Sequence, residues 1–298
     1  MNLKHLVNKA KDKSNFTDLK GFVSFCNEYL EYIADNLQAT IVSQNETHYR
    51  FYQYNEEGNF KISRPINSKL MYNAKQFANT KKEFIKILKG LRTIDRNDNV
   101  VRQIINNTTY TIQQSVGSAL DGLPDGESNT ARKLNGDLFE HFIRLIFKEG
   151  GLDCSSGVVQ VPIPYKLNEN YKMSYQHDLI IKSEGKIKLL GSIKTSSKDR
   201  LDKIFLDKHL YNKLTSSETP HIAIFLNDVQ RKKSKIENKY GINATFLPGH
   251  FIGYTIALNP LDGVYYCDIR PNMRTERFLK DHIKTFDNLL IEDIWKFI

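Results

Sequence analysis

The chain has 298 residues, enough to bury a hydrophobic core, and its three cysteines form no CxxC pair, which excludes a disulfide framework and a cysteine-based zinc cluster. Its 43 Lys and Arg exceed its 34 Asp and Glu, and the resulting net charge of +9 favours a polyanionic partner. No run of eighteen apolar residues and no apolar leader is present, so we expect a cytoplasmic protein that does not span a membrane.

The first 120 residues are mostly helical in pattern. Apolar side chains recur at helical spacing in three stretches, whereas HYRFYQY has the composition of a strand. We expect helices over residues 18–37, about 72–91 and about 97–120, and a strand over 48–54. No glycine-rich phosphate loop, repeat or low-complexity tract interrupts this half of the chain.

A stretch rich in Gly, Pro, Asp and Ser, LDGLPDGESNTARK, then separates two parts of different character. We place a domain boundary near residue 122. Residues 1–121 would form a mostly helical accessory region, whose residues leave open nucleic-acid contacts, a dimer surface or an effector site. Residues 122–298 would form the second domain.

The second half alternates helices with β-rich runs. KLNGDLFEHFIRLIFK carries one apolar face and ends at a pair of glycines, as helices do. We predict helices over 133–148, 199–214, 274–286 and 289–298, and strands over 156–165, 175–182, 186–194, 221–228 and 250–258. This order predicts an α/β fold with a mixed central β-sheet flanked by helices.

Two charged side chains interrupt the most apolar strands. Asp178 lies inside YQHDLIIK, where a carboxylate needs a partner or a metal ion, and Lys194 ends LLGSIK. Hydrolysis of a phosphodiester requires a cation to neutralise the charge that develops on phosphorus and a group that positions the attacking water. Asp178 as a Mg²⁺ ligand and Lys194 beside it would supply both functions.

The layout of a helix, a strand with Asp and a strand with Lys resembles the PD-(D/E)XK nucleases, which include most type II restriction endonucleases. His177 stands where the general motif has Pro, and Ser192 stands where it has Asp or Glu. The EcoRII/PspGI/NgoMIV branch also lacks the acid before the lysine and supplies it from the following helix. Asp207, thirteen residues after Lys194, matches that position, although the branch usually has Glu there.

Two further segments carry the resemblance, which covers roughly residues 120–228. ARKLNGDLFEH is similar to the first core helix of the family, which implies that Glu140 completes the metal site with Asp178 and Asp207. KTSSKDR resembles the block with which the branch reads C:G pairs. The resemblance implies base recognition by Lys198, Asp199 and Arg200, since Arg or Lys donates to guanine while a carboxylate accepts from cytosine.

A dense basic cluster follows the strand-like run at 221–228. Arg231, Lys232 and Lys233 begin it, in what we expect to be a loop that reaches DNA phosphates. A solvated surface loop is the competing interpretation of this cluster.

The proposed site residues also have interpretations that involve no catalysis. Asp178 would then form a structural ion pair, and Glu140 and Asp207 would be solvated helix residues. Lys198–Arg200 would simply be an exposed helix start, with Asp199 as its capping group.

The resemblance implies a type II restriction endonuclease that cuts double-stranded DNA with Mg²⁺ at a short palindromic site containing CC and GG. A two-fold site calls for a homodimer. A cognate DNA methyltransferase would be encoded nearby, without a stable complex between the two. Two different functions fit the same residues: a repair or structure-selective nuclease without sequence specificity, and a DNA-binding protein that does not cleave.

Overall fold

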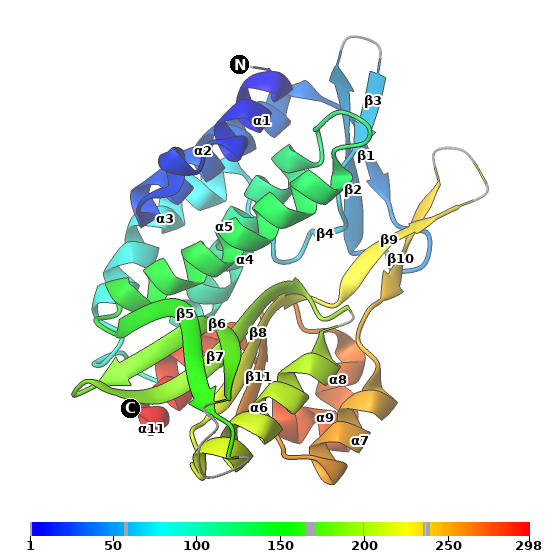
Figure 1. Ribbon diagram of the computed structural model, residues 1–298. Helices are drawn as coiled ribbons and strands as arrows, with labels where there is room; N and C mark the ends of the chain where they lie inside the picture. The colour runs from blue at the N-terminus through cyan, green and yellow to red at the C-terminus, as the bar shows by residue number, and fades with distance from the viewer. Residues whose placement is uncertain (1, 57–58, 165–170, 199, 235, 237–238) are drawn as a thin grey trace.

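The computed structural model describes residues 2–56, 59–164, 171–198, 200–234, 236 and 239–298. Five α-helices of the first half pack as a bundle around the fourth, whose residues 105–120 are all buried (Figure 1). They are α1 (Leu3–Lys11), α2 (Leu19–Asn36), α3 (Ala74–Lys89), α4 (Asn99–Leu120) and α5 (Ser128–Glu149), with a 3₁₀ turn at Lys13–Phe16. Asn or Asp side chains cap the starts of α1 to α4 by accepting backbone N–H bonds, which explains why these helices begin where they do.

A small antiparallel sheet accompanies these helices. It contains β1 (Leu37–Val42), β2 (Tyr49–Glu56), β3 (Asn59–Ile62) and β4 (Ile66–Asn67), and β2 pairs with the other three. The predicted strand at 48–54 is β2. The mostly helical character predicted for this region is therefore confirmed, with the sheet as an addition.

The second half is built on a six-stranded mixed sheet in the order β12-β11-β8-β7-β6-β5. Strands β5, β6 and β7 pair antiparallel, whereas β7, β8, β11 and β12 pair parallel. The strands are β5 (Asp153–Pro162), β6 (Lys172–Ser183), β7 (Lys186–Ser196), β8 (His221–Asn227), β11 (Gly263–Tyr266) and β12 (Ile283–Thr285). The mixed α/β sheet predicted from the sequence is confirmed.

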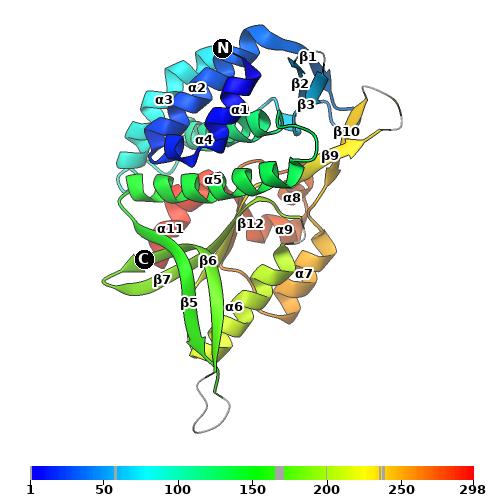
Figure 2. The same cartoon turned by 45° about the horizontal axis from the view of Figure 1, so that its top comes forward.

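Helices cover both faces of this sheet (Figures 1 and 2). Along β8, Ile222 and Ile224 belong to the core shared with α4 and α5, whereas Ala223 and Phe225 pack in a cluster with α6, α7 and α9. The covering helices are α6 (Leu201–Thr215), α7 (Pro248–Ala257) and α9 (Arg277–His282). The chain also forms α8 (Pro271–Thr275), α10 (Phe286–Asn288), a π-helical turn at Leu289–Asp293 and α11 (Ile294–Phe297).

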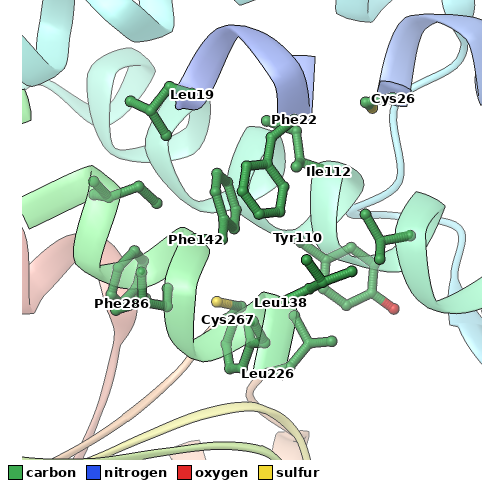
Figure 3. Close-up of a cluster of buried hydrophobic side chains, with 14 of the residues drawn as sticks. Leu19, Phe22, Cys26, Tyr110, Ile112, Leu138, Phe142, Leu226, Cys267 and Phe286 are labelled. Carbon is green, nitrogen blue, oxygen red and sulfur yellow. The ribbon is translucent and has the colours of Figure 1, made fainter. Parts of the chain in front are cut away.

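One continuous core joins the two halves of the chain (Figure 3). Phe22 of α2 stacks on Phe142 of α5 at a centroid distance of 4.8 Å, and Tyr110 of α4 belongs to the same cluster as Leu226 and Cys267. Residues on both sides of the proposed boundary at 122 thus share buried surface. The division into 1–121 and 122–298 remains a prediction.

Two predicted elements are wrong. Residues 250–258, predicted as a strand, lie almost entirely in α7, where Pro248 occupies the first turn and Phe251 and Thr255 form the buried face. A short apolar run does not distinguish helix from strand by its period. The helix predicted over 274–286 is interrupted because Ile283 and the two residues after it pair in parallel with β11.

The three cysteines are free thiols, and all are buried. Across the described residues, we find no helix with the length and hydropathy required to traverse a bilayer.

Candidate active site

Helix α5 carries two side chains that reach strands of the central sheet. Glu140 and Arg144 are four residues apart and therefore lie on one face of the helix. The Arg144 guanidinium donates to the Asp178 carbonyl oxygen at 2.9 Å, which attaches α5 to β6 beside the Asp178 side chain. Arg144 was not among the predicted site residues, although its spacing from Glu140 was a usable signal.

Asp178 lies where β6 and β7 diverge. The two strands pair as far as Leu179 and Gly191, and beyond that point β7 pairs only with β8. The Asp178 carboxylate occupies the fork and accepts the Ile193 backbone N–H at 2.9 Å. Ser155 of β5 pairs with Ile180 of β6, and Gly157 pairs with His177, so two residues of β6 lie opposite one residue of β5. Irregularities of this kind redirect side chains near active sites.

Lys194 joins two carboxylates. Its Nζ atom lies 2.8 Å from Glu140 Oε1 and 2.5 Å from Asp178 Oδ2. Burial alone would lower the pKa of Lys194, but attraction to Asp178 and hydrogen bonds to both acids outweigh it and raise that pKa. Burial and repulsion from Asp178 raise the pKa of Glu140. The tertiary structure therefore brings together Glu140, Asp178 and Lys194, three of the predicted catalytic residues.

The donor set suits a hard divalent cation. Two carboxylates converge on one ammonium group, so the site already concentrates negative charge around a single cation. Mg²⁺ is commonly held by one or two carboxylates together with substrate phosphate and water, so Glu140 and Asp178 fit it. Among the described residues, no group of three or more His, Cys, Asp or Glu side chains is arranged to hold a metal ion.

Asp207 occupies a different environment. It lies on α6, where its carboxylate pairs with Lys203, and its charge acts on Tyr175 and His177. In the part of the chain that the structure describes, it makes no hydrogen bond or ion pair with Glu140, Asp178 or Lys194. Its assignment as a metal ligand remains a prediction.

The packing of α6 explains this placement. Tyr211, one turn after Asp207, belongs to a buried cluster with Tyr175 on β6, whereas α5 packs on the opposite face of the sheet. The aromatic cluster also contains His177, which lies 6.0 Å from the Tyr211 ring and 5.8 Å from that of His221. Burial lowers the pKa of His177, as expected for a neutral structural histidine.

A cleft of about 1230 Å³ opens in front of Glu140 and Lys194. Its walls come from β3, α5, the end of β7, the start of α6 and the hairpin of β9 (Val229–Lys233) and β10 (Tyr240–Ala244). All four acidic residues of the lining pair with a basic side chain. Six cations of the lining form no ion pair among the described residues: Arg132, Lys133, Lys198, Arg200, Arg231 and Lys239. The cleft therefore presents uncompensated positive charge to a ligand.

The basic cluster at 231–233 lies on the β9–β10 hairpin, which corrects the expected loop. The loop prediction was wrong because Arg231, Lys232 and Lys233 pair in register with β10. Arg231 and Lys232 are exposed, and the Lys233 side chain lies outside the described part of the structure. Arg231 also lines the cleft and donates to the Ile62 carbonyl at 2.9 Å.

The N-terminal sheet supports this hairpin (Figure 1). The Asn45 side chain pairs with the backbone of Ile242, donating to its carbonyl and accepting its N–H, each at 2.9 Å. Tyr49 and Phe51 of β2 pack with Val229 and Ile242 in one apolar cluster. Residues before the proposed boundary thus help to form one wall of the cleft.

The predicted base-reading residues lie at the start of α6. Lys198 and Arg200 are exposed and line the cleft, and Arg200 is the residue that precedes the first helical turn. Asp199 lies outside the described residues. The role of all three in reading bases remains a prediction.

The mixed sheet with helices on both faces has the fold of a solved type II restriction endonuclease. The crystal structure of the type IIP restriction endonuclease Kpn2I aligns with a TM-score of 0.73 at 19% identity, over 99% of this chain and 97% of that chain. The restriction endonuclease PspGI-substrate DNA complex aligns with a TM-score of 0.42 at 15% identity, over 74% of this chain and 90% of that chain. No protein-family model and no curated protein sequence matches the chain.

Proposed function

We propose that this protein is a type II restriction endonuclease, a site-specific deoxyribonuclease that hydrolyses phosphodiester bonds of double-stranded DNA with Mg²⁺. One observation carries the proposal. Within a restriction-endonuclease fold, Lys194 bridges Glu140 and Asp178 at the wall of a cleft whose lining has six cations without an ion pair among the described residues. A polyanionic substrate matches the charge of the cleft, and the three side chains match the chemistry of phosphodiester hydrolysis.

Each residue has a defined role in this proposal. Glu140 and Asp178 would hold Mg²⁺, which supplies charge neutralisation at phosphorus and a more acidic bound water. Lys194 positions the attacking water and stabilises the negative charge that develops on the phosphoryl oxygens. Arg144 is a positioning residue, because its bond to the Asp178 carbonyl fixes β6 against α5. Asp207 would join this set only if α6 changed position on binding.

Residues of the cleft walls would recognise the DNA sequence and bind the DNA backbone. Lys198, Asp199 and Arg200 are proposed to read C:G pairs of a short palindromic site that contains CC and GG. Arg231, Lys232 and Lys233 are proposed to contact DNA phosphates. We further propose a homodimer, because two copies can present the same groups to the two halves of a symmetric site. A cognate methyltransferase encoded nearby would protect the host DNA.

Incubation of the purified protein with a long duplex of known sequence, with Mg²⁺ and with EDTA, tests the activity. Discrete fragments that form only with Mg²⁺ support the proposal, and mapping of their ends tests the CC/GG expectation. A smear would instead favour a nonspecific nuclease. Asp178→Ala should abolish cleavage and leave DNA binding measurable, whereas Asp202→Ala, an exposed acid of α6, serves as the matched control. Loss of sequence preference in Arg200→Ala would support base reading, and unchanged discrimination would refute it.

The second candidate function is DNA binding without cleavage. Two observations favour it: Ser192 replaces the acid of the general motif, and Asp207 pairs with Lys203 instead of joining the two carboxylates. Sequence-specific binding by folded protein that leaves DNA intact at every Mg²⁺ concentration would make it the better interpretation.

A further inference from the structure

A glycine in the middle of α5 has no role in the packing of the protein itself. A Cβ atom built on Gly136 would meet no atom within 4 Å outside its immediate surroundings in the helix. Two other helical glycines differ, because a Cβ at Gly117 would lie 2.2 Å from Arg64 Nη1 and one at Gly21 would lie 2.1 Å from the Asn15 carbonyl oxygen. Internal contacts therefore require Gly21 and Gly117 but not Gly136.

Glycine is unfavourable in a helix interior relative to alanine, since it loses more conformational freedom on folding. α5 extends from Ser128 to Glu149, so Gly136 lies well inside it. Alanine would fit at this position without a clash. The open space at Gly136 is therefore available to an external group, and Gly136 differs from Gly253 of α7, which is equally open, because Gly136 lines the cleft.

The position of Gly136 identifies that group. Gly136 lines the cleft, and it lies on one helical face between Lys133, three residues before it, and Glu140, four residues after it. Lys133 is exposed and forms no ion pair among the described residues, and Glu140 is bonded to Lys194. The acidic neighbour Asp137 pairs with Lys13 at 2.7 Å, which reduces its repulsion of an anion.

We propose that the sugar–phosphate backbone of the DNA strand to be cut crosses α5 at Gly136. Lys133 contacts one phosphate of this strand, and the phosphates that follow lie closer to Glu140 and Lys194. This inference rests on the proposed function. Without a Cβ, the strand approaches the helix backbone closely enough for contacts of the Cα–H···O type. Gly136 is thus a positioning residue that sets the depth of the strand relative to the carboxylates.

The test compares Gly136→Ala with Gly253→Ala. Gly253 lies on α7 outside the cleft and also has open space at its Cβ, so both substitutions add helix propensity and should preserve or raise the melting temperature. Gly136→Ala should slow single-turnover cleavage on the order of 10- to 100-fold and weaken duplex binding in EDTA, because a small displacement of the reacting phosphate is costly. Gly253→Ala should match the wild type in both assays.

Each other outcome overturns the inference. Normal cleavage and binding by Gly136→Ala would show that no strand contacts this position. A lower melting temperature for Gly136→Ala would show that an internal contact requires the glycine, and equal losses in both variants would assign the effect to helix stiffness. These results leave the proposed function intact, whereas a wild type that neither binds nor cuts duplex DNA would refute the function together with the inference.

Discussion

Replacement of Lys194 by methionine removes the cation that forms ion pairs with both Glu140 and Asp178. Methionine keeps much of the length of the lysine side chain and none of its charge. The side chains of Glu140 and Asp178 are 25% and 11% exposed, so water compensates the two carboxylates only in part after the change. The variant should therefore be less stable without a metal ion. It should also lose cleavage activity, because no side chain at position 194 would position the attacking water or stabilise the charge on the phosphoryl oxygens.

The size of the effect follows from the burial of the three groups. Removal of one partner from a fully buried ion pair costs about 3–5 kcal/mol, and exposed pairs contribute about 0–1 kcal/mol, so this partly buried site should lose about 1–3 kcal/mol. Binding of Mg²⁺ at about a hundred times its dissociation constant would raise the free energy of unfolding by about 2.7 kcal/mol. In the wild type, Lys194 competes with the metal ion for the same oxygens, so the stabilisation by Mg²⁺ should be smaller.

Urea denaturation of both proteins in EDTA and in excess Mg²⁺ measures these differences. Lys203→Met is the matched control, because it breaks the ion pair of a side chain that is 65% exposed and should change the free energy of unfolding by less than about 1 kcal/mol. If Lys194→Met is as stable as the wild type in EDTA, or if Mg²⁺ stabilises it no more than the wild type, the two carboxylates do not act as one cation site.

Three further predictions test other parts of the molecule. Asp207→Asn should change the cleavage rate less than about threefold, because Asp207 pairs with Lys203; a loss as large as that of Asp178→Ala would show that α6 moves on binding. Burial raises the pKa of Asp228 from 3.8 to about 7, so the folded state binds the proton more tightly and this group's contribution to stability falls as pH rises through that window, by up to about 1.4 kcal/mol per pH unit. Asp228→Asn should flatten the decrease in the urea-derived free energy of unfolding between about pH 5 and about pH 7.5, and an unchanged slope would contradict this. Arg231→Ala and Lys232→Ala should each weaken duplex binding at all sequences and reduce the dependence of log affinity on log salt by about one, so unchanged salt dependence would exclude phosphate contacts.

The sequence by itself predicted the elements whose patterns are long and periodic. The helix predicted at 133–148 lies within α5, and the apolar runs around Asp178 and Lys194 lie in β6 and β7. A charged residue inside an apolar strand is informative on its own, because its burial requires a partner. The arrangement of Asp178 and Lys194 as partners at one site was therefore predictable from residue types and order.

Short or ambiguous segments could not be predicted in this way. The run at 250–258 has too few residues for its period to separate helix from strand, and its conformation in α7 depends on contacts of Phe251 with α6 and α9. The basic cluster at 231–233 forms a hairpin because Asn45 and the N-terminal sheet hold it, and these contacts join residues that are 197 positions apart in the sequence.

Only the tertiary structure decided which helical carboxylate forms an ion pair with Lys194 and which segments line the cleft. Glu140 and Asp207 were both acids at matching sequence positions, but α5 and α6 lie on opposite faces of the sheet, and only Glu140 reaches the ammonium group. Similarly, no local pattern indicated that α5, the N-terminal sheet and the β9–β10 hairpin would enclose one basic cleft. The physical reason is that periodicity reports which face of an element is buried, whereas the neighbours of that face are set by the packing of the whole chain.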